Sequence, residues 1–138
     1  MSSIFTKIIN REIPADIIYE DETFIAMLDI NPLHDGHTLV IPKKEIDYIF
    51  DLDDEIYLSL MEISKKIAKI IDEKLKSKLN FKRVGIIVEG FGVPHVHVHL
   101  IPLTDPFDLQ IKAKLEHKDT YRNKMSKEEI KQILLGNN

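Results

Sequence analysis

Apolar and polar side chains alternate over several short runs of the chain. This pattern predicts β-strands, because successive side chains of a strand point to opposite faces. The expected strands cover residues 16–20, 23–29, 37–42 and 82–89, and a fifth starts at His95. In the second run the side chains divide between two faces, with Ile25, Met27 and Asp29 on one and Phe24, Ala26 and Leu28 on the other. Residues 16–29 therefore predict a hairpin.

One longer segment has the period of a helix. Over residues 53–77 the apolar side chains recur every three or four positions and lysines fill the opposite face; the apolar set is Ile56, Leu60, Ile63, Ile67, Ile70 and Ile71. Asp51 or Asp53 is expected to cap this helix.

Two shorter helical segments are expected near the ends of the chain. A helical turn is predicted near residues 4–10. Ser126 and Glu129 have the spacing of a capping box, which predicts a helix over residues 127–135 that Gly136 ends. Together the elements predict an α+β domain: an antiparallel sheet, one long helix and a short C-terminal helix.

Composition narrows the class of protein. The 138 residues suit one core, and a net charge of −4 argues against non-specific nucleic-acid binding, which usually needs a basic face. The chain has no cysteine, so it cannot form disulfides, thiolate metal sites or a thiol nucleophile. It has neither a run that resembles a signal peptide nor one of about 20 apolar residues that could span a membrane. A cytoplasmic protein without membrane contact is therefore expected.

The strongest functional signal is the fifth strand, which reads His95-Val96-His97-Val98-His99. In a strand the three imidazoles share one face and the aliphatic residues share the other. Gly90 and Gly92 come just before, and glycines let backbone N–H groups approach a ligand closely.

Three chemical interpretations fit this strand. The histidines could bind zinc or iron, with His37 as a further ligand. One ring could attack phosphorus while its neighbours orient it and hold phosphate oxygens. They could also be a polar face without chemistry. The glycines favour phosphate recognition, because phosphate needs backbone donors and a metal site does not.

Several separated motifs resemble the histidine triad (HIT) family, in particular its Hint-like nucleotide-binding members. They are the triad with Leu100-Ile101, the N-terminal stretch from Ile4 to Ala15, Asp29-Ile30-Asn31-Pro32, and the stretch from Gly36 to Lys44. The resemblance implies a HIT domain over residues 1–110, followed by a tail over 111–138 that carries the short helix. It also implies an enzyme that binds an AMP-like purine nucleotide, and a homodimer in which the sheets of two subunits join.

The resemblance assigns a role to each matching residue. His97 corresponds to the nucleophile that attacks the α-phosphorus and forms a nucleotidyl-histidine. His99 corresponds to the phosphate contact, and it indicates a hydrolase because transferase relatives have glutamine there. His95 orients the nucleophile, and His37 is expected to fix the tautomer of a triad ring.

The nucleotide-binding positions follow from the same resemblance. Asp29 corresponds to the carboxylate that accepts hydrogen bonds from ribose, and backbone N–H groups near Gly92 and Val93 are expected to face phosphate. Ile4, Phe5, Ile8, Met27 and Ile30 match positions that line the base pocket. His34 and His117 match nothing and are expected to be solvated.

The chain departs from the family pattern in two places. Where many relatives bind structural zinc through Cys-X-X-Cys and a histidine, it has Ser3, Thr6 and Glu45, so we expect no metal and no cofactor. Where Hint-like enzymes carry side-chain donors before the triad, it has Val88, Phe91 and Gly92.

The sequence therefore predicts hydrolysis of nucleoside phosphoramidates or related nucleotidyl conjugates at the α-phosphorus, by a nucleoside phosphoramidase or a dinucleoside polyphosphate hydrolase. It leaves two alternatives open: a non-catalytic purine-nucleotide-binding or interaction module, and a metalloenzyme with histidine ligands.

Overall fold

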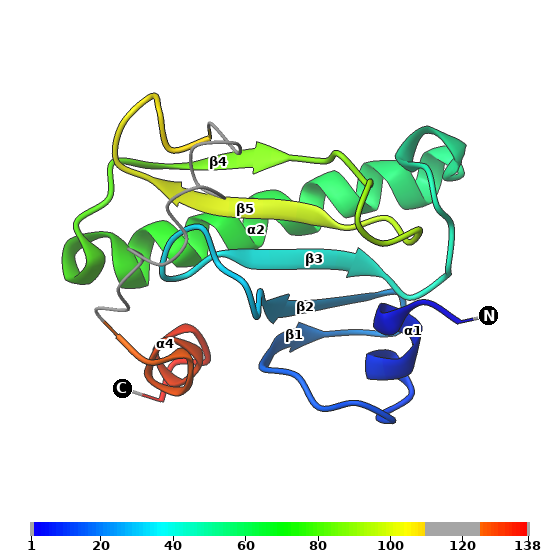
Figure 1. The fold of residues 1–138 in the computed structure, drawn as a ribbon, viewed down its shortest axis with the longest axis horizontal. Helices are drawn as coiled ribbons and strands as arrows, with labels where there is room; N and C mark the ends of the chain where they lie inside the picture. Colours follow the sequence, from blue (N-terminus) through cyan, green and yellow to red (C-terminus); the bar gives the residue numbers. More distant parts are fainter. Residues whose placement is uncertain (1, 110–124, 138) are drawn as a thin grey trace.

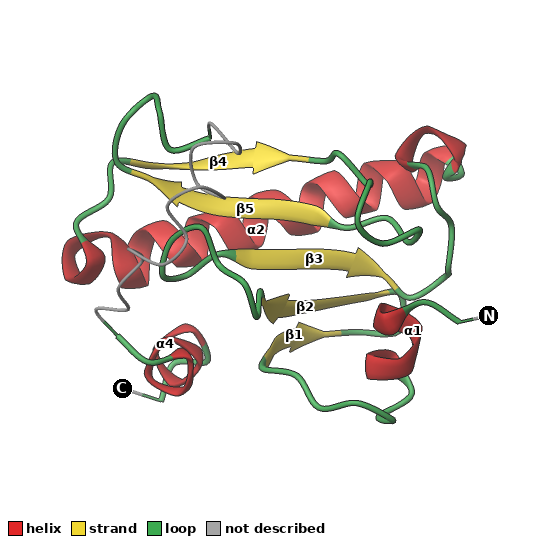
Figure 2. Cartoon of the chain, viewed as in Figure 1, coloured by secondary structure: helices red, strands yellow, loops and turns green. Residues whose placement is uncertain are grey.

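The computed structural model describes residues 2–109 and 125–137. Its elements, in chain order, are α1 (Ile4–Ile9), β1 (Ile17–Glu20), β2 (Phe24–Leu28), β3 (Thr38–Pro42), the 3-10 turn η1 (Ile49–Asp51), α2 (Asp54–Leu79), β4 (Arg83–Ile87), β5 (Val98–Leu103) and α4 (Lys127–Leu134). In this part of the chain, five strands form one antiparallel sheet in the order β1-β2-β3-β5-β4 (Figure 1). Figure 2 shows the helices and strands that make up this α+β fold, which confirms the predicted class.

One face of the sheet packs on the long helix α2, which runs along it (Figure 1). The helix contributes Leu60, Ile67, Ile71 and Leu75, all at most 2% exposed. The sheet contributes the predicted Phe24, Ala26 and Leu28 of β2 and Val98 and Leu100 of β5, and Val96 just before β5 joins them. The alternation therefore predicted the face correctly, because only an unbroken apolar face can exclude water against the helix.

The opposite face carries a second, smaller apolar cluster beneath α1. Phe5 and Ile8 of the helix cover Ile25, Met27, Leu39 and Ile41 of the sheet. The sequence pattern placed Asp29 on this face, and Phe5 packs against the rings of His95 and His97 here. The short helix α1 therefore covers one face of the sheet, whereas α2 covers the other.

The helix boundaries follow local chemistry. Of the two predicted caps, Asp51 and Asp53, it is Asp53 that occupies the N-cap of α2. Its side chain makes no capping hydrogen bond. The helix ends at Asn80, whose φ of 56° is left-handed. The predicted capping box is present in α4, between Ser126 and Glu129, and Gly136 follows its end with a φ of +83°.

The histidine strand starts later than predicted: β5 begins at Val98, so His95 and His97 lie in the extended segment just before it. The cause is Pro42, which would stand opposite Val96 in the ladder and has no N–H to donate. The Val96 N–H instead donates to the carbonyl of Ile46, at 2.7 Å. The ladder therefore stops and leaves the Pro42 carbonyl for another donor.

The C-terminal helix α4 packs into the larger core through Ile130, Ile133 and Leu134. Its start is fixed by the Met125 N–H, which donates to the buried Asp35 carboxylate at 3.1 Å. The predicted domain boundary at residue 110 and His117 lie outside the described residues, so these predictions stay untested. No helix in the described ranges combines the length and apolar character needed to cross a bilayer.

Candidate active site

His97 lies at the centre of the candidate site, beneath α1. Its Nδ1 is 2.7 Å from the carbonyl oxygen of His95, so Nδ1 carries the proton and donates it. In the neutral ring this leaves the lone pair on Nε2, to which no described residue forms a hydrogen bond. The Phe5 ring packs edge-on against the imidazole, with centroids 5.0 Å apart. Backbone and packing thus leave one defined nitrogen, Nε2, with its lone pair available to a ligand.

His95 is fully buried, with 0% exposure, and both of its ring nitrogens have partners. Nε2 donates to the free Pro42 carbonyl at 2.7 Å, and Nδ1 accepts from the Ser3 hydroxyl at 2.7 Å. A ring that is bonded on both sides cannot contact phosphate. Its own backbone carbonyl accepts the His97 Nδ1–H, so the buried ring anchors the segment that holds His97.

A polar network anchors His95 to the N-terminal helix. The Glu45 carboxylate accepts the Ser3 N–H at 2.7 Å and the Thr6 hydroxyl at 2.6 Å. Ser3 also caps α1, because its Oγ accepts the Thr6 N–H at 3.1 Å. We call Ser3, Thr6, Glu45 and His95 the Ser3–Glu45 network.

The Ser3–Glu45 network occupies the place where the resemblance locates structural zinc in relatives, and its residues do not fit that metal. Structural zinc favours thiolates and imidazoles, whereas this site offers two hydroxyls and one carboxylate. The His95 nitrogen that faces the site already accepts a hydrogen bond from Ser3. The donor set therefore favours a hydrogen-bonded anchor.

His99 and His37 form a hydrogen-bonded pair beside His97. The Leu33 N–H donates to His37 Nδ1 at 3.1 Å, so His37 carries its proton on Nε2. That proton is donated to His99 Nδ1 at 2.9 Å, and His99 in turn keeps its proton on Nε2. Among the described side chains, His99 Nε2 is a buried polar atom without a hydrogen-bond partner. A buried N–H of this kind is an open donor for a ligand oxygen.

Burial keeps these rings neutral at physiological pH. It lowers the pKa of His37 from 6.5 to about 4, although the Asp29 carboxylate opposes the shift. Burial also lowers the pKa of His95 and of His99, and for His99 the neighbouring His97 adds to the effect. The neutral state is the one that the hydrogen-bond pattern requires.

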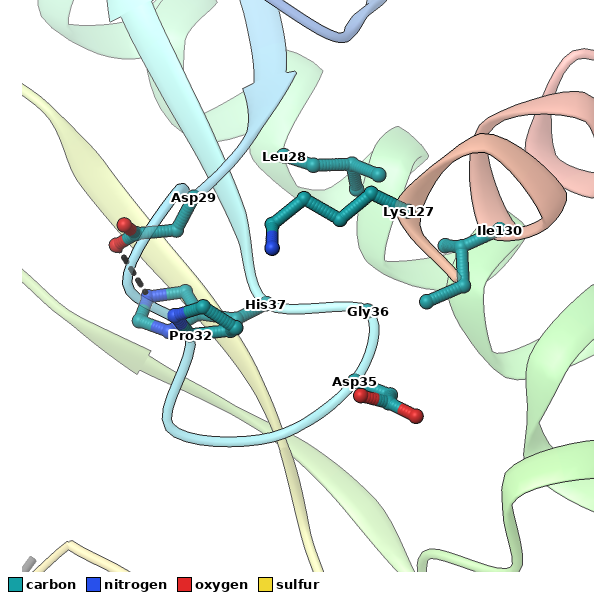
Figure 3. A pocket seen from close by; sticks show the side chains of 8 residues that line it. All are labelled: Leu28, Asp29, Pro32, Asp35, Gly36, His37, Lys127 and Ile130. Atoms are coloured by element: carbon teal, nitrogen blue, oxygen red, sulfur yellow. Dashed lines mark ion pairs between the residues drawn. The ribbon is translucent and has the colours of Figure 1, made fainter. Parts of the chain in front are cut away.

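Asp29 stands where β2 ends, with Oδ2 3.4 Å from His37 Nε2 (Figure 3). Its Oδ1 accepts the Asn31 N–H at 2.8 Å, which fixes the carboxylate at the start of the loop. Asp29 and His37 line a small pocket of about 10 Å³ together with Lys127 and Ile130 of α4. The predicted ribose acceptor therefore lies next to the histidines, and α4 forms one wall beside it.

The predicted base-pocket positions differ in exposure. Phe5, Ile8 and Met27 are buried in the smaller apolar cluster, and Val93 packs against it. Ile4 is 41% exposed and Ile30 is 68% exposed, so these two side chains are free to meet a ligand. Gly92 lies in open space, since a Cβ there would meet no atom within 4 Å.

Sequence reasoning missed two features of the site. It treated Ser3, Thr6 and Glu45 only as lost zinc ligands, and it did not consider Glu89, whose Oε1 lies 3.8 Å from His99 Nε2. The position of Glu89 in the glycine-containing segment before the triad was the available signal. His34, expected to be solvated, is instead partly buried, and its ring packs edge-on against Phe81.

Two groups of side chains bring potential metal-ligand atoms within 4.8 Å of one another in the described part of the chain. They are Asp29 with His37 and His99, and Glu89 with His97 and His99. In the first group both nitrogens of His37 already have hydrogen-bond partners. The first group is therefore held together by hydrogen bonds, and His37 has no free nitrogen for a metal.

Comparison with known proteins identifies the family of the chain. The HIT domain family model matches residues 10–105. The chain is 42% identical over 104 residues to an uncharacterised HIT-like protein of Methanocaldococcus jannaschii, covering 72% of this chain and 77% of that protein. It is 38% identical over 102 residues to an adenosine 5'-monophosphoramidase of Schizosaccharomyces pombe, covering 74% of each.

A solved structure extends the likeness to the whole fold. The zinc-bound histidine triad family protein from Mycobacterium smegmatis superposes with a TM-score of 0.78 at 29% identity, covering 99% of this chain and 93% of that one. The motif, the sheet with its histidine pair and the family match all agree, and the chain belongs to the HIT family.

Proposed function

We propose that this protein is a nucleotide hydrolase that cleaves at the α-phosphorus of nucleoside phosphoramidates or related nucleotidyl conjugates, with His97 as the nucleophile. Membership of the HIT family supports a nucleotide hydrolase, and the relative named adenosine 5'-monophosphoramidase supports an AMP-linked substrate. The observation that carries the proposal is the His97 lone pair on Nε2 beside the unpartnered N–H of His99, with ring centroids 4.9 Å apart.

In the first half of the reaction, His97 Nε2 attacks phosphorus and the bond to the leaving group breaks. The ring becomes a nucleotidylated imidazolium, and its Nδ1–H donates to the His95 carbonyl, which stabilises the new positive charge. The His99 N–H donates to a non-bridging phosphate oxygen. Because the ring positions are preset, little reorganisation accompanies the charge change.

In the second half, water attacks the same phosphorus and displaces His97, which releases the nucleoside monophosphate. His37 keeps the His99 N–H directed at the phosphate oxygens through both steps, because it donates to His99 Nδ1. A protonated His37 would keep its donor but lose the acceptor for the Leu33 N–H. Its low pKa of about 4 makes that state rare at neutral pH.

The nucleoside end is proposed to lie along α1 and the loop after β2. Asp29 offers carboxylate oxygens to the ribose hydroxyls, and Ile4 and Ile30 provide exposed apolar surface for a base. These residues suit a purine nucleotide, but they do not determine which purine base it carries.

A homodimer stays a prediction, and the edge of the sheet supports it. Among the described residues β4 pairs with β5 alone, and it places Ile86, 49% exposed, at this edge of the sheet. An unpaired strand edge with exposed apolar side chains is suited to pairing with a second copy.

The proposal is tested with the substitution His97→Asn. The asparagine amide can still donate to the His95 carbonyl but lacks a nucleophilic nitrogen. With adenosine 5'-phosphoramidate as substrate, we expect AMP release to fall more than about 10³-fold. Mass spectrometry of the wild type, quenched in alkali during turnover, should detect one added adenylyl group that the variant lacks.

Two results would contradict the proposal. If the variant released AMP within tenfold of the wild type, another group would be the nucleophile. If the wild type bound AMP but released none, the protein would be the non-catalytic binding module. Assays with and without a chelator, alongside metal analysis, decide the metalloenzyme alternative, because the proposed chemistry continues when metals are removed.

A further inference from the structure

Glu89 places a negative charge at the phosphate end of the site. Its Oε1 lies 3.8 Å from His99 Nε2, the buried N–H that has no hydrogen-bond partner among the residues the structure describes. One carboxylate oxygen of Glu89 and one ring nitrogen each of His97 and His99 lie within 4.8 Å of one another. The carboxylate therefore lies beside both the His97 ring and the His99 N–H.

The turn before the triad holds this carboxylate in place. Glu89 Oε2 accepts the Phe91 N–H at 3.0 Å, and Gly90 between them has a φ of +73°, which glycine adopts at little cost. Glu89 is about one-third exposed, whereas Phe91 is 94% exposed and turned to solvent. The segment that lacks side-chain donors thus presents a fixed acceptor.

A carboxylate at this position discriminates between leaving groups by charge. A phosphate oxygen that accepts the His99 N–H lies within a few ångströms of Glu89, so each additional negative charge there is repelled. A positively charged amine is attracted at the same point. The charge on the departing group, more than its shape, then decides how well it is accommodated.

We infer that Glu89 selects amine leaving groups over anionic ones such as a nucleoside polyphosphate. This inference rests on the proposed function and adds a specificity-determining residue to it. As the bond from His97 Nε2 to phosphorus forms, the P–N bond breaks and its electron pair stays on nitrogen. The nitrogen takes up protons from water and departs as an ammonium ion, which Glu89 attracts.

The test compares wild type with Glu89→Gln, which keeps the acceptor for the Phe91 N–H and removes only the charge. The two substrates share one adenylyl group: an adenosine phosphoramidate of the lysine ε-amine, and diadenosine triphosphate, whose leaving group is ADP. We expect the ratio of kcat/KM for the amine substrate to that for the anionic one to fall at least about 10-fold. Glu22→Gln, on the β1–β2 turn, is the matched charge control and keeps the wild-type ratio.

The salt dependence of this ratio distinguishes an electrostatic role of Glu89 from a merely structural one. Raising the ionic strength should reduce the wild-type ratio toward that of Glu89→Gln, because screening weakens the charge effect, and should leave the variant unchanged. An unchanged or increased ratio in Glu89→Gln would overturn the inference.

Binding separates this inference from the proposed function. The phosphate of AMP is mostly dianionic at neutral pH, whereas the phosphoryl group of adenosine 5'-phosphoramidate carries one charge. Calorimetry on Glu89→Gln should show AMP binding tightened several-fold more than phosphoramidate binding, even if no turnover occurs. Equal changes for both ligands would overturn the role of Glu89, whereas absence of turnover in the wild type would overturn only the proposed function.

Discussion

Acid should destabilise this protein through His37, and the size of the effect follows from its burial. The ring is 3% exposed and its pKa is about 4 in the folded chain, against 6.5 for an ordinary histidine. Between these values the unfolded chain binds a proton that the folded chain does not. Stability therefore falls as the pH drops from 6.5 toward 4, and protons favour the unfolded state.

The magnitude comes from the linkage relation, in which one pKa unit is worth about 1.4 kcal/mol. For His37 alone the free energy of unfolding should decrease by about 2 kcal/mol between pH 7 and pH 5, and by about 3 kcal/mol at pH 4. For a small domain this is a large share of the total stability.

The substitution His37→Asn isolates this contribution. The asparagine Oδ1 can accept the Leu33 N–H in place of Nδ1, so the loop keeps its hydrogen bond while the titrating group is removed. Urea unfolding, followed by circular dichroism at pH 7, 6 and 5, gives the free energy at each pH for both proteins. The variant keeps the smaller acid sensitivity that His95 and His99 supply.

The contribution of His37 is the difference between the two proteins in how the free energy of unfolding changes with pH. We expect the wild-type free energy to fall about 2 kcal/mol more than that of the variant between pH 7 and pH 5. Parallel profiles would refute the reasoning, since they would mean that His37 is protonated as readily in the folded chain as in the unfolded one.

Two further substitutions test the surroundings of the site. Ser3→Ala removes both the cap of α1 and the hydrogen bond to buried His95 Nδ1, so the free energy of unfolding measured in urea should decrease by about 2–4 kcal/mol. Ser3→Thr keeps a hydroxyl and should recover most of this loss. Ser2→Ala, at the exposed neighbouring position, should change the free energy little. A loss below about 0.5 kcal/mol would argue against the hydrogen bonds. Gly36→Ala should cost about 1–3 kcal/mol, because φ is +88° and the new Cβ would lie 3.2 Å from a Leu75 methyl; unchanged thermal unfolding would contradict this.

Features set by local periodicity could be predicted from the sequence. The alternation on β2 assigned Phe24 and Ile25 to opposite faces, and the structure places them in different apolar clusters. The capping box at Ser126 was predicted correctly because the interaction spans only three residues. In both cases the deciding contacts lie within one element or follow its period.

Features that depend on distant segments could not be predicted in the same way. The start of β5 moved to Val98 because a proline on another strand lacks a donor, and the turn η1 has no periodic pattern. The partners of Ser3 are 42 residues away in Glu45 and 92 away in His95. Such pairs are decided by how the whole chain packs, so the residues were recognisable but their contacts were not.

The roles of the individual histidines lie between these cases. Their spacing placed the rings on one face, and the resemblance proposed His97 as the nucleophile. The tautomers came only from the structure, because the Leu33 N–H and the His95 carbonyl determine which nitrogens carry protons. No pattern in the sequence encodes these backbone partners.

The Ser3–Glu45 network has a consequence for where this fold can operate. A site built from thiolates depends on a supply of zinc and is damaged when its sulfur atoms are oxidised. Hydroxyl, carboxylate and imidazole groups need no ion loaded during folding and have no sulfur to lose. This chain contains no cysteine at all. We therefore expect the anchor of its N-terminal helix to assemble in metal-poor surroundings and to survive peroxide exposure that would inactivate a thiolate site.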